Sequence, residues 1–209
     1  MTDIGLISII RGVRPDEAAE IGWALYEGGI RIVEVPLNSP HPFASIRALR
    51  DALPADCHVG AGTVLAIDEV GRAADAGVRL IVSPNTDTAV VGATVARGLD
   101  SYPGCATPTE AFTAIGAGAS RLKLFPANSI GPDGLAAWRS VLPLGVSLVP
   151  VGGVGVSNLA GWIAAGAAGA GIGSWLYKPG DAPDKVRERA LEVTSAWTFC
   201  VAAEQEAQR

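Results

Sequence analysis

The chain has 209 residues, of which 49% are apolar and only 18% are charged, and its formal net charge is -5. An acidic chain without a basic stripe lacks the charge pattern by which proteins bind nucleic acid or anionic membrane surfaces. The length predicts one domain, residues 1–209, that folds around one core.

A short pattern repeats along the chain. A helical stretch ends at a glycine, an apolar run follows, and a loop of Pro, Gly or polar residues closes the unit. Glycine past a helix end supplies the left-handed cap. The apolar runs are typical of strands covered on both faces, and strands that alternate with helices form parallel sheets. The expected strands are residues 4–10, 30–36, 58–64, 78–84, 99–104, 119–126, 147–153 and 167–173.

Eight such units predict an α/β fold, a (β/α)8 TIM barrel with eight parallel strands. A doubly wound open sheet is the alternative, and the polar segment from about Pro183 predicts a solvated closing helix. In a barrel of this kind, catalytic groups lie at the carboxyl ends of the strands. Those ends hold Arg11 and Gly12, Glu34, Pro36 to Asn38, Gly62 and Thr63, Pro84 and Asn85, Pro103 and Gly104, Lys123 to Pro126, Val151 to Gly153, and Gly173 and Ser174.

The sequence predicts a cytoplasmic protein. Residues 1–10 have no basic segment before their apolar run, so they do not resemble a signal peptide. Residues 140–177 carry no charge, but prolines, glycines and polar residues interrupt them, which favours buried α/β structure over a membrane span. Cys57, Cys105 and Cys200 are far apart and odd in number, as expected of reduced structural thiols.

Lys123 is unusual because it lies inside an apolar strand run, whereas the other two lysines, Lys178 and Lys185, lie in polar surroundings. A lysine in such a strand is often a snorkelling or ion-paired side chain. Apolar walls, however, disfavour the ammonium and lower its pKa, which leaves an amine that can attack a carbonyl. Lys123 is therefore a candidate Schiff-base nucleophile.

Glu34 is a second ionisable residue within an apolar strand, and burying a carboxylate without a partner is costly. Strand ends converge at a barrel mouth, so Glu34 is expected near Lys123, either as a buried ion pair or as a general acid/base. Arg11 is a candidate for binding a carboxylate through two parallel hydrogen bonds. The alternative is an ordinary arginine at the rim of the barrel. Thr63 offers a hydroxyl, or is a turn or N-cap residue.

Two glycine loops, "VGGVGVSN" and "GIGSW", follow the last two expected strands. In these positions backbone N–H groups hold phosphate in many barrels. Neither loop has a GxGxxG or Walker pattern, and glycine also serves tight turns. His41 and His58 have no ligand-spaced partner, so neither a metal nor a cofactor is expected, and no Ser-His-Asp grouping is present.

Seven ordered segments resemble the class I aldolases of 2-keto-3-deoxy-6-phosphosugar acids over nearly the whole chain. They are "VEVPLNSP", "GAGTVL", "LIVSPN", "PGCATPTEAF", "LKLFPA", "VGGV" and "GAGIGS". The resemblance implies a metal-free (β/α)8 barrel that forms a homotrimer. It places the imine-forming lysine on Lys123 and the acid/base glutamate on Glu34. Substrate-binding positions fall on Arg11 and Thr63, and the phosphate site falls on Gly152, Gly153, Gly173 and Ser174.

The implied reaction cleaves 2-dehydro-3-deoxy-6-phospho-D-galactonate to pyruvate and D-glyceraldehyde 3-phosphate. Gluconate-type relatives have Arg where this chain has Asn38 and Thr where it has Val151, so both positions are similar to the galactonate type. "FPA" and "GSWL" also occur in gluconate-type sequences, which leaves the gluconate epimer or dual specificity as alternatives. Two rivals remain: a phosphate-binding isomerase or synthase, and a non-catalytic phosphosugar-binding barrel.

Overall fold

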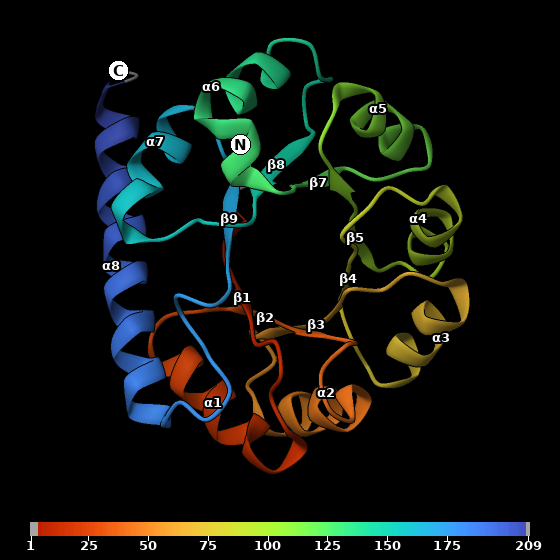
Figure 1. Ribbon diagram of the computed structural model, residues 1–209, viewed down its shortest axis with the longest axis vertical. Helices are drawn as coiled ribbons and strands as arrows, with labels where there is room; N and C mark the ends of the chain where they lie inside the picture. The colour runs from red at the N-terminus through yellow and green to blue at the C-terminus, as the bar shows by residue number, and fades with distance from the viewer. Residues whose placement is uncertain (1–3, 208–209) are drawn as a thin grey trace.

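The computed structural model describes residues 4–207, so the outermost ends of the expected domain, residues 1–3 and 208–209, lie outside the described residues. Parallel strands alternate with helices along the chain (Figure 1). The elements are β1 (Gly5–Ile9), α1 (Pro15–Glu27), β2 (Ile32–Pro36), α2 (Pro42–Ala52), β3 (His58–Gly62), α3 (Ile67–Asp75), β4 (Leu80–Val82), α4 (Thr88–Val95), β5 (Asp100–Tyr102), β6 (Gly104–Cys105), α5 (Pro108–Gly116), β7 (Arg121–Leu124), α6 (Ala127–Arg139), β8 (Ser147–Pro150), the 3-10 helix η1 (Val156–Asn158), α7 (Leu159–Ala164), β9 (Gly169–Ile172) and α8 (Pro183–Ala207).

Local sequence explains where several elements begin and end. The carboxylate of Asp87 accepts a hydrogen bond from the Ala89 amide (2.8 Å) at the start of α4. Thr107 and Glu110 form a capping box at α5. The glycines expected before strands take the left-handed conformation, which confirms the repeating pattern; they are Gly29 (φ 91), Gly77 (φ 87), Gly98 (φ 70), Gly118 (φ 103) and Gly166 (φ 93).

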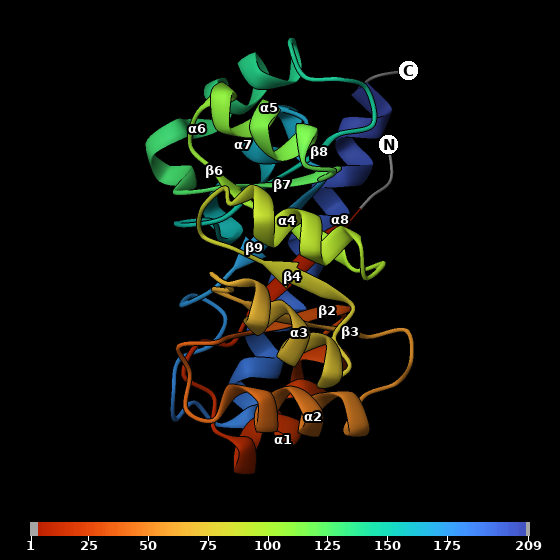
Figure 2. The ribbon, with the colours of Figure 1, turned by 90° about the vertical axis from the view of Figure 1, so that its right-hand side faces the viewer.

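The predicted closed barrel of eight strands is wrong. The strands form two parallel sheets: a curled six-stranded sheet in the order β5-β4-β3-β2-β1-β9, and a three-stranded sheet in the order β6-β7-β8. The doubly wound alternative is not formed either, because the helices lie outside the curled sheets (Figure 1). Figure 2 shows α2, α3, α4 and α5 following one another along this outer surface.

Two prolines mark the seams where regular pairing between the sheets is interrupted, although single hydrogen bonds still cross them, from the Gly104 amide to the Asn85 carbonyl (3.2 Å) and from the Ala168 amide to the Leu148 carbonyl (2.9 Å). The expected strand 99–104 is divided at Pro103, which has no N–H to donate, so β5 pairs only with β4 and β6 pairs only with β7. At the other seam, Pro150 ends β8, and a single bridge joins Val151 to Gly171. Gly152 then turns the chain away with a φ of 105. The two sheets therefore meet without a continuous ladder.

Alternation along β7 decides which side chains face the interior. Leu122 and Leu124 belong to the large core between strands and helices. Lys123 lies between them and pairs in register with Val149, which belongs to a smaller cluster on the inner face of the sheets. Because successive side chains of a strand point to opposite faces, Lys123 points inward. The remaining members of the inner cluster include Ile7, Ile9, Leu80, Val82, Tyr102 and Val151.

The closing helix begins at Pro183, as expected, but it is not solvated on all sides. One face of α8 buries Val186, Ala190, Val193 and Trp197, at spacings of three and four residues, and the helix packs against α1 and α7. Within residues 4–207, no helix is long and apolar enough to cross a membrane.

Candidate active site

Lys123 is buried on the inner face, with 6% of its surface exposed, and its Nζ lies 4.6 Å from the centroid of the Phe125 ring. Burial lowers the pKa of Lys123 because water no longer stabilises the ammonium. Nearby Glu34 opposes this effect and raises the pKa, whereas Arg11 lowers it further. A larger fraction of the side chain is therefore free amine at neutral pH than in an exposed lysine, as a nucleophile requires.

Glu34 lies on β2 and is almost fully buried, with 2% exposed. Burial raises its pKa to about 7, although Lys123 and Arg11 both lower it. Among residues 4–207 its Oε2 atom has no hydrogen-bond partner, so it is available to a substrate. A carboxyl group with a pKa near 7 can both accept and donate a proton at neutral pH, which suits a general acid/base.

Gly62 provides the space for this carboxylate. A Cβ atom built on Gly62 would lie 1.8 Å from Glu34 Oε2 and 2.4 Å from its Cδ. The pairing of β2 with β3 sets this arrangement, since Pro36 is opposite Gly62 and Glu34 is two residues earlier. From the sequence, Gly62 is only a strand end, because no local pattern shows that its missing side chain makes room for Glu34.

Arg11 follows β1 and its Nη1 donates a hydrogen bond to Oδ1 of Asn38, a residue after β2. In the same loop pair, the Gly12 amide donates to Ser39 Oγ at 2.9 Å. Arg11 is thus oriented by a neutral amide, and its positive charge is not neutralised there. Sequence reasoning did not identify Ser39, although it lies in the "PLNSP" segment that follows the expected strand.

Thr63 lies directly after β3 and has a φ of 55, one of two positive values among the described non-glycine residues. A β-branched residue in the left-handed region is strained, and such strain is concentrated at functional sites. The conformation bends the chain at the strand end, and it keeps Thr63 a candidate for a functional residue.

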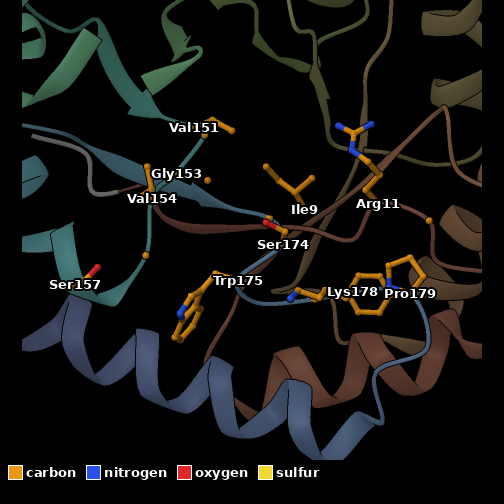
Figure 3. Close-up of a pocket in the computed structure, with 16 residues that line it drawn as sticks. Ile9, Arg11, Val151, Gly153, Val154, Ser157, Ser174, Trp175, Lys178 and Pro179 are labelled. Atoms are coloured by element: carbon orange, nitrogen blue, oxygen red, sulfur yellow. The ribbon is translucent and has the colours of Figure 1, made fainter. Parts of the chain in front are cut away.

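A pocket of about 620 Å³ lies at the carboxyl ends of β1, β8 and β9 (Figure 3). It brings together six of the nine predicted site residues, whereas Lys123, Glu34 and Thr63 do not line it. Ile9, two residues before Arg11, lines the pocket and pairs in register with Glu34, and Val149, two residues before the lining residue Val151, pairs with Lys123, so the buried pair borders the pocket. The six predicted residues are Arg11, Val151, Gly152, Gly153, Gly173 and Ser174.

The glycine loops of the pocket require glycine. Gly152 and Gly153 have φ values of 105 and 75, which other residues rarely adopt. The pocket also contains residues that sequence reasoning did not select. Gly155, Ser157 and Trp175 lie within the two glycine motifs, which was the available signal, and Tyr177, Lys178 and Pro179 follow the second motif.

Residues 4–207 contain no group of three or more His, Cys, Asp and Glu side chains that could hold a metal ion. The site offers a buried amine and a buried carboxyl group beside a pocket that is lined by Arg11 and the two glycine loops.

Residues 1–188 match the model of the family described as "KDPG and KHG aldolase". The chain belongs to this aldolase family. It is 46% identical over 200 residues to a "Probable 2-dehydro-3-deoxy-6-phosphogalactonate aldolase" of Rhizobium meliloti (strain 1021), covering 96% of this chain and 94% of the relative.

Two solved structures are also similar to this aldolase-family chain. One, described as "Native KDPGal structure", has a TM-score of 0.93 and 44% identity, with 97% of this chain and 98% of that chain covered. The other is a cube-shaped protein cage "designed by fusing symmetric oligomeric domains"; its TM-score is 0.96 at 42% identity, covering 99% of this chain and 77% of that one.

Substitution of Gly62 tests how Glu34 is positioned. Gly62→Ala is expected to lower kcat about 100-fold, because the methyl group forces the carboxylate to move, and misplacement by about 1 Å has an effect of this order. Steady-state aldol cleavage measures the change. Gly116→Ala is the control, since a Cβ there meets nothing within 4 Å. Full activity of a folded Gly62→Ala protein would contradict the assignment.

Proposed function

We propose that this aldolase-family chain cleaves 2-dehydro-3-deoxy-6-phospho-D-galactonate to pyruvate and D-glyceraldehyde 3-phosphate through a Schiff base on Lys123. The observation that supports the proposal most is the buried Lys123 amine, which shares the inner face with the buried Glu34 carboxyl group beside an anion-binding pocket. A phosphosugar-binding protein without catalysis has no need for two ionisable groups in this interior, where desolvation is costly.

The reaction begins when the Lys123 amine attacks the C2 ketone and water leaves, which gives a protonated imine. Glu34 then accepts the proton of the C4 hydroxyl, directly or through water. The C3–C4 bond breaks, its electron pair moves into the imine, and glyceraldehyde 3-phosphate leaves. Glu34 returns the proton to C3 of the resulting enamine, and hydrolysis releases pyruvate and the free amine. A Glu34 pKa of about 7 suits both proton transfers.

The two ends of the substrate require different partners. Arg11 and Thr63 bind the carboxylate end in this proposal, because Arg11 borders the catalytic pair and a guanidinium can bind a carboxylate in a fork. The glycine loops bind the phosphate through their backbone N–H groups, with the Ser174 hydroxyl beside them. These residues are Gly152, Gly153, Gly173 and Ser174, and all four line the pocket.

Val151 supports the galactonate epimer. It is 7% exposed, lies on the inner face and lines the pocket, so its position offers no hydroxyl to a gluconate-type C4 hydroxyl. Asn38 binds Arg11 where gluconate-type relatives have an arginine. The relative that is 46% identical bears the galactonate name. The gluconate epimer remains the alternative substrate.

We also propose that the whole chain is one catalytic domain of a cytoplasmic enzyme. The three cysteines are free, as is typical of proteins from a reducing compartment.

Reductive trapping tests the Schiff base. Sodium borohydride with pyruvate is expected to leave one covalent pyruvate-derived adduct on Lys123, detected by peptide mass spectrometry, because the reduced imine no longer hydrolyses. Lys123→Ala is expected to abolish both the adduct and aldol cleavage. Lys185→Ala is the control, since Lys185 forms an exposed ion pair with Asp181. An adduct that persists in Lys123→Ala would reject the mechanism.

Substrate preference tests the assignment of Val151. We expect the wild-type chain to cleave the galactonate epimer with the higher kcat/KM. Val151→Thr is expected to shift the ratio toward the gluconate epimer by about tenfold, the upper range for one added hydrogen bond. Val154→Thr adds a hydroxyl elsewhere in the pocket and serves as the control. A wild-type preference for gluconate would show that Val151 and Asn38 do not set the specificity.

We propose a homotrimer as the assembly. Leu65 and Ile67 are about half exposed near the start of α3, as expected of a subunit contact. A structural relative comes from a cage built of symmetric oligomeric domains. Size-exclusion chromatography with light scattering is expected to give three times the mass of one chain, and Ile67→Glu is expected to release smaller species. A monomeric or dimeric wild-type protein would contradict this proposal.

A further inference from the structure

The charges that line the 620 Å³ pocket are unusual for this chain. Its lining includes two cationic side chains, Arg11 and Lys178, and no carboxylate among the described lining residues, although the chain as a whole has a net charge of -5. An enclosed surface of one sign concentrates ligands of the opposite sign. Arg11 borders the catalytic pair, so the second cation is available for a different part of the ligand.

The ammonium of Lys178 has no ion pair or hydrogen bond within the part of the chain that the structure describes. The nearest candidate partner, Asp181, is already occupied. Its carboxylate accepts hydrogen bonds from Arg189 Nη1 (2.6 Å), Lys185 Nζ (2.9 Å) and the backbone amide of Lys178 (3.0 Å). Asp181 therefore fixes the backbone of Lys178 through the amide, while Arg189 and Lys185 neutralise the charge of the Asp181 carboxylate.

The turn after β9 directs Lys178 back toward the pocket. The amides of Leu176 and Tyr177 both donate to the Gly173 carbonyl, at 2.8 and 3.1 Å, which closes a tight turn around Ser174. Tyr177 is anchored to α1 by a 3.0 Å hydrogen bond to Glu17. In Figure 3, Lys178 lies below Ser174 and between Trp175 and Pro179. All four residues line the same pocket. The lysine thus lies beside the glycine loops on a well-supported turn.

The glycine loops provide N–H groups but no full charge. The first loop leads into short helices, since η1 covers three residues and α7 covers six, so their dipoles contribute little. The second loop leads into a turn, and α8 begins only at Pro183. A phosphate monoester carries nearly two negative charges at neutral pH, and charge-assisted hydrogen bonds to it are about twice as strong as neutral ones. A lysine is suited to this role because its compact ammonium binds phosphate as a point charge.

We infer that Lys178 binds the phosphate group of the substrate and supplies the positive charge that the glycine loops lack. This inference rests on the proposed function. Lys178 is a substrate-binding residue that distinguishes a phosphorylated sugar acid from its unphosphorylated counterpart, and it takes no part in the covalent chemistry at Lys123.

The test compares Lys178→Met, Lys178→Arg and, as the control, Lys185→Met, which removes a lysine seven residues away that is paired with Asp181. Each is assayed with the phosphorylated substrate, with the same sugar acid lacking phosphate, and with inorganic phosphate as inhibitor. Lys178→Met is expected to raise KM for the phosphorylated substrate about tenfold and to weaken phosphate inhibition by a similar factor, with a smaller effect on kcat. Arginine is expected to restore much of the affinity.

The other readouts separate binding from folding and from the chemistry. The inference requires the loss to be confined to phosphorylated ligands, with thermal unfolding of Lys178→Met close to that of the wild type. An equal rise in KM for the phosphorylated and the unphosphorylated sugar acid would show that Lys178 has a structural role, and it would overturn the inference. Unchanged KM and unchanged phosphate inhibition would also overturn it. Borohydride trapping with pyruvate needs no phosphate, so only failure of that reaction in the wild type rejects the proposed aldolase mechanism.

Discussion

The structure depends on the burial of two ionisable side chains, Lys123 and Glu34, on the inner face of parallel sheets. Burying either group in its charged form is costly, and burial moves both pKa values toward neutrality, down for the amine and up to about 7 for the carboxyl group. Burial thus favours the neutral form of each group, while the attraction between the two groups favours their charged forms. The same shift makes one group nucleophilic and lets the other exchange protons.

Glycines on the strands make room for this interior. A Cβ on Gly60 would lie 2.6 Å from Leu80, one on Gly62 would collide with Glu34, and one on Gly171 would lie 2.6 Å from Val151. In each case the glycine of one strand accommodates a large side chain of its neighbour, and strand register fixes which residues meet. The active-site carboxylate is therefore positioned by the same packing that fills the apolar interior.

The sequence was sufficient for features that depend on local chemistry. Glycines before strands and apolar strand runs follow from conformational preference and from burial on both faces. The sequence left open which face of β7 carries Lys123, because alternation alone does not say which side of the sheet is the interior. It was insufficient where two distant segments meet. Pro103 interrupts the hydrogen-bonded strand pairing only because β5 and β6 have different neighbouring strands. Lys178 reaches the pocket only through the turn at Gly173. Pairing of Arg11 with Asn38 likewise depends on two loops that no local pattern connects.

Arg11 affects both catalytic groups in the proposed reaction. Because Asn38 orients it without neutralising it, its field lowers the pKa values of both Lys123 and Glu34 in the empty site. This keeps the amine available for attack on the ketone. Once the protonated imine has formed on Lys123, its positive charge lies beside Glu34 and favours the carboxylate form, which is the form that accepts the C4 proton. The covalent step thus prepares the base for the bond cleavage that follows.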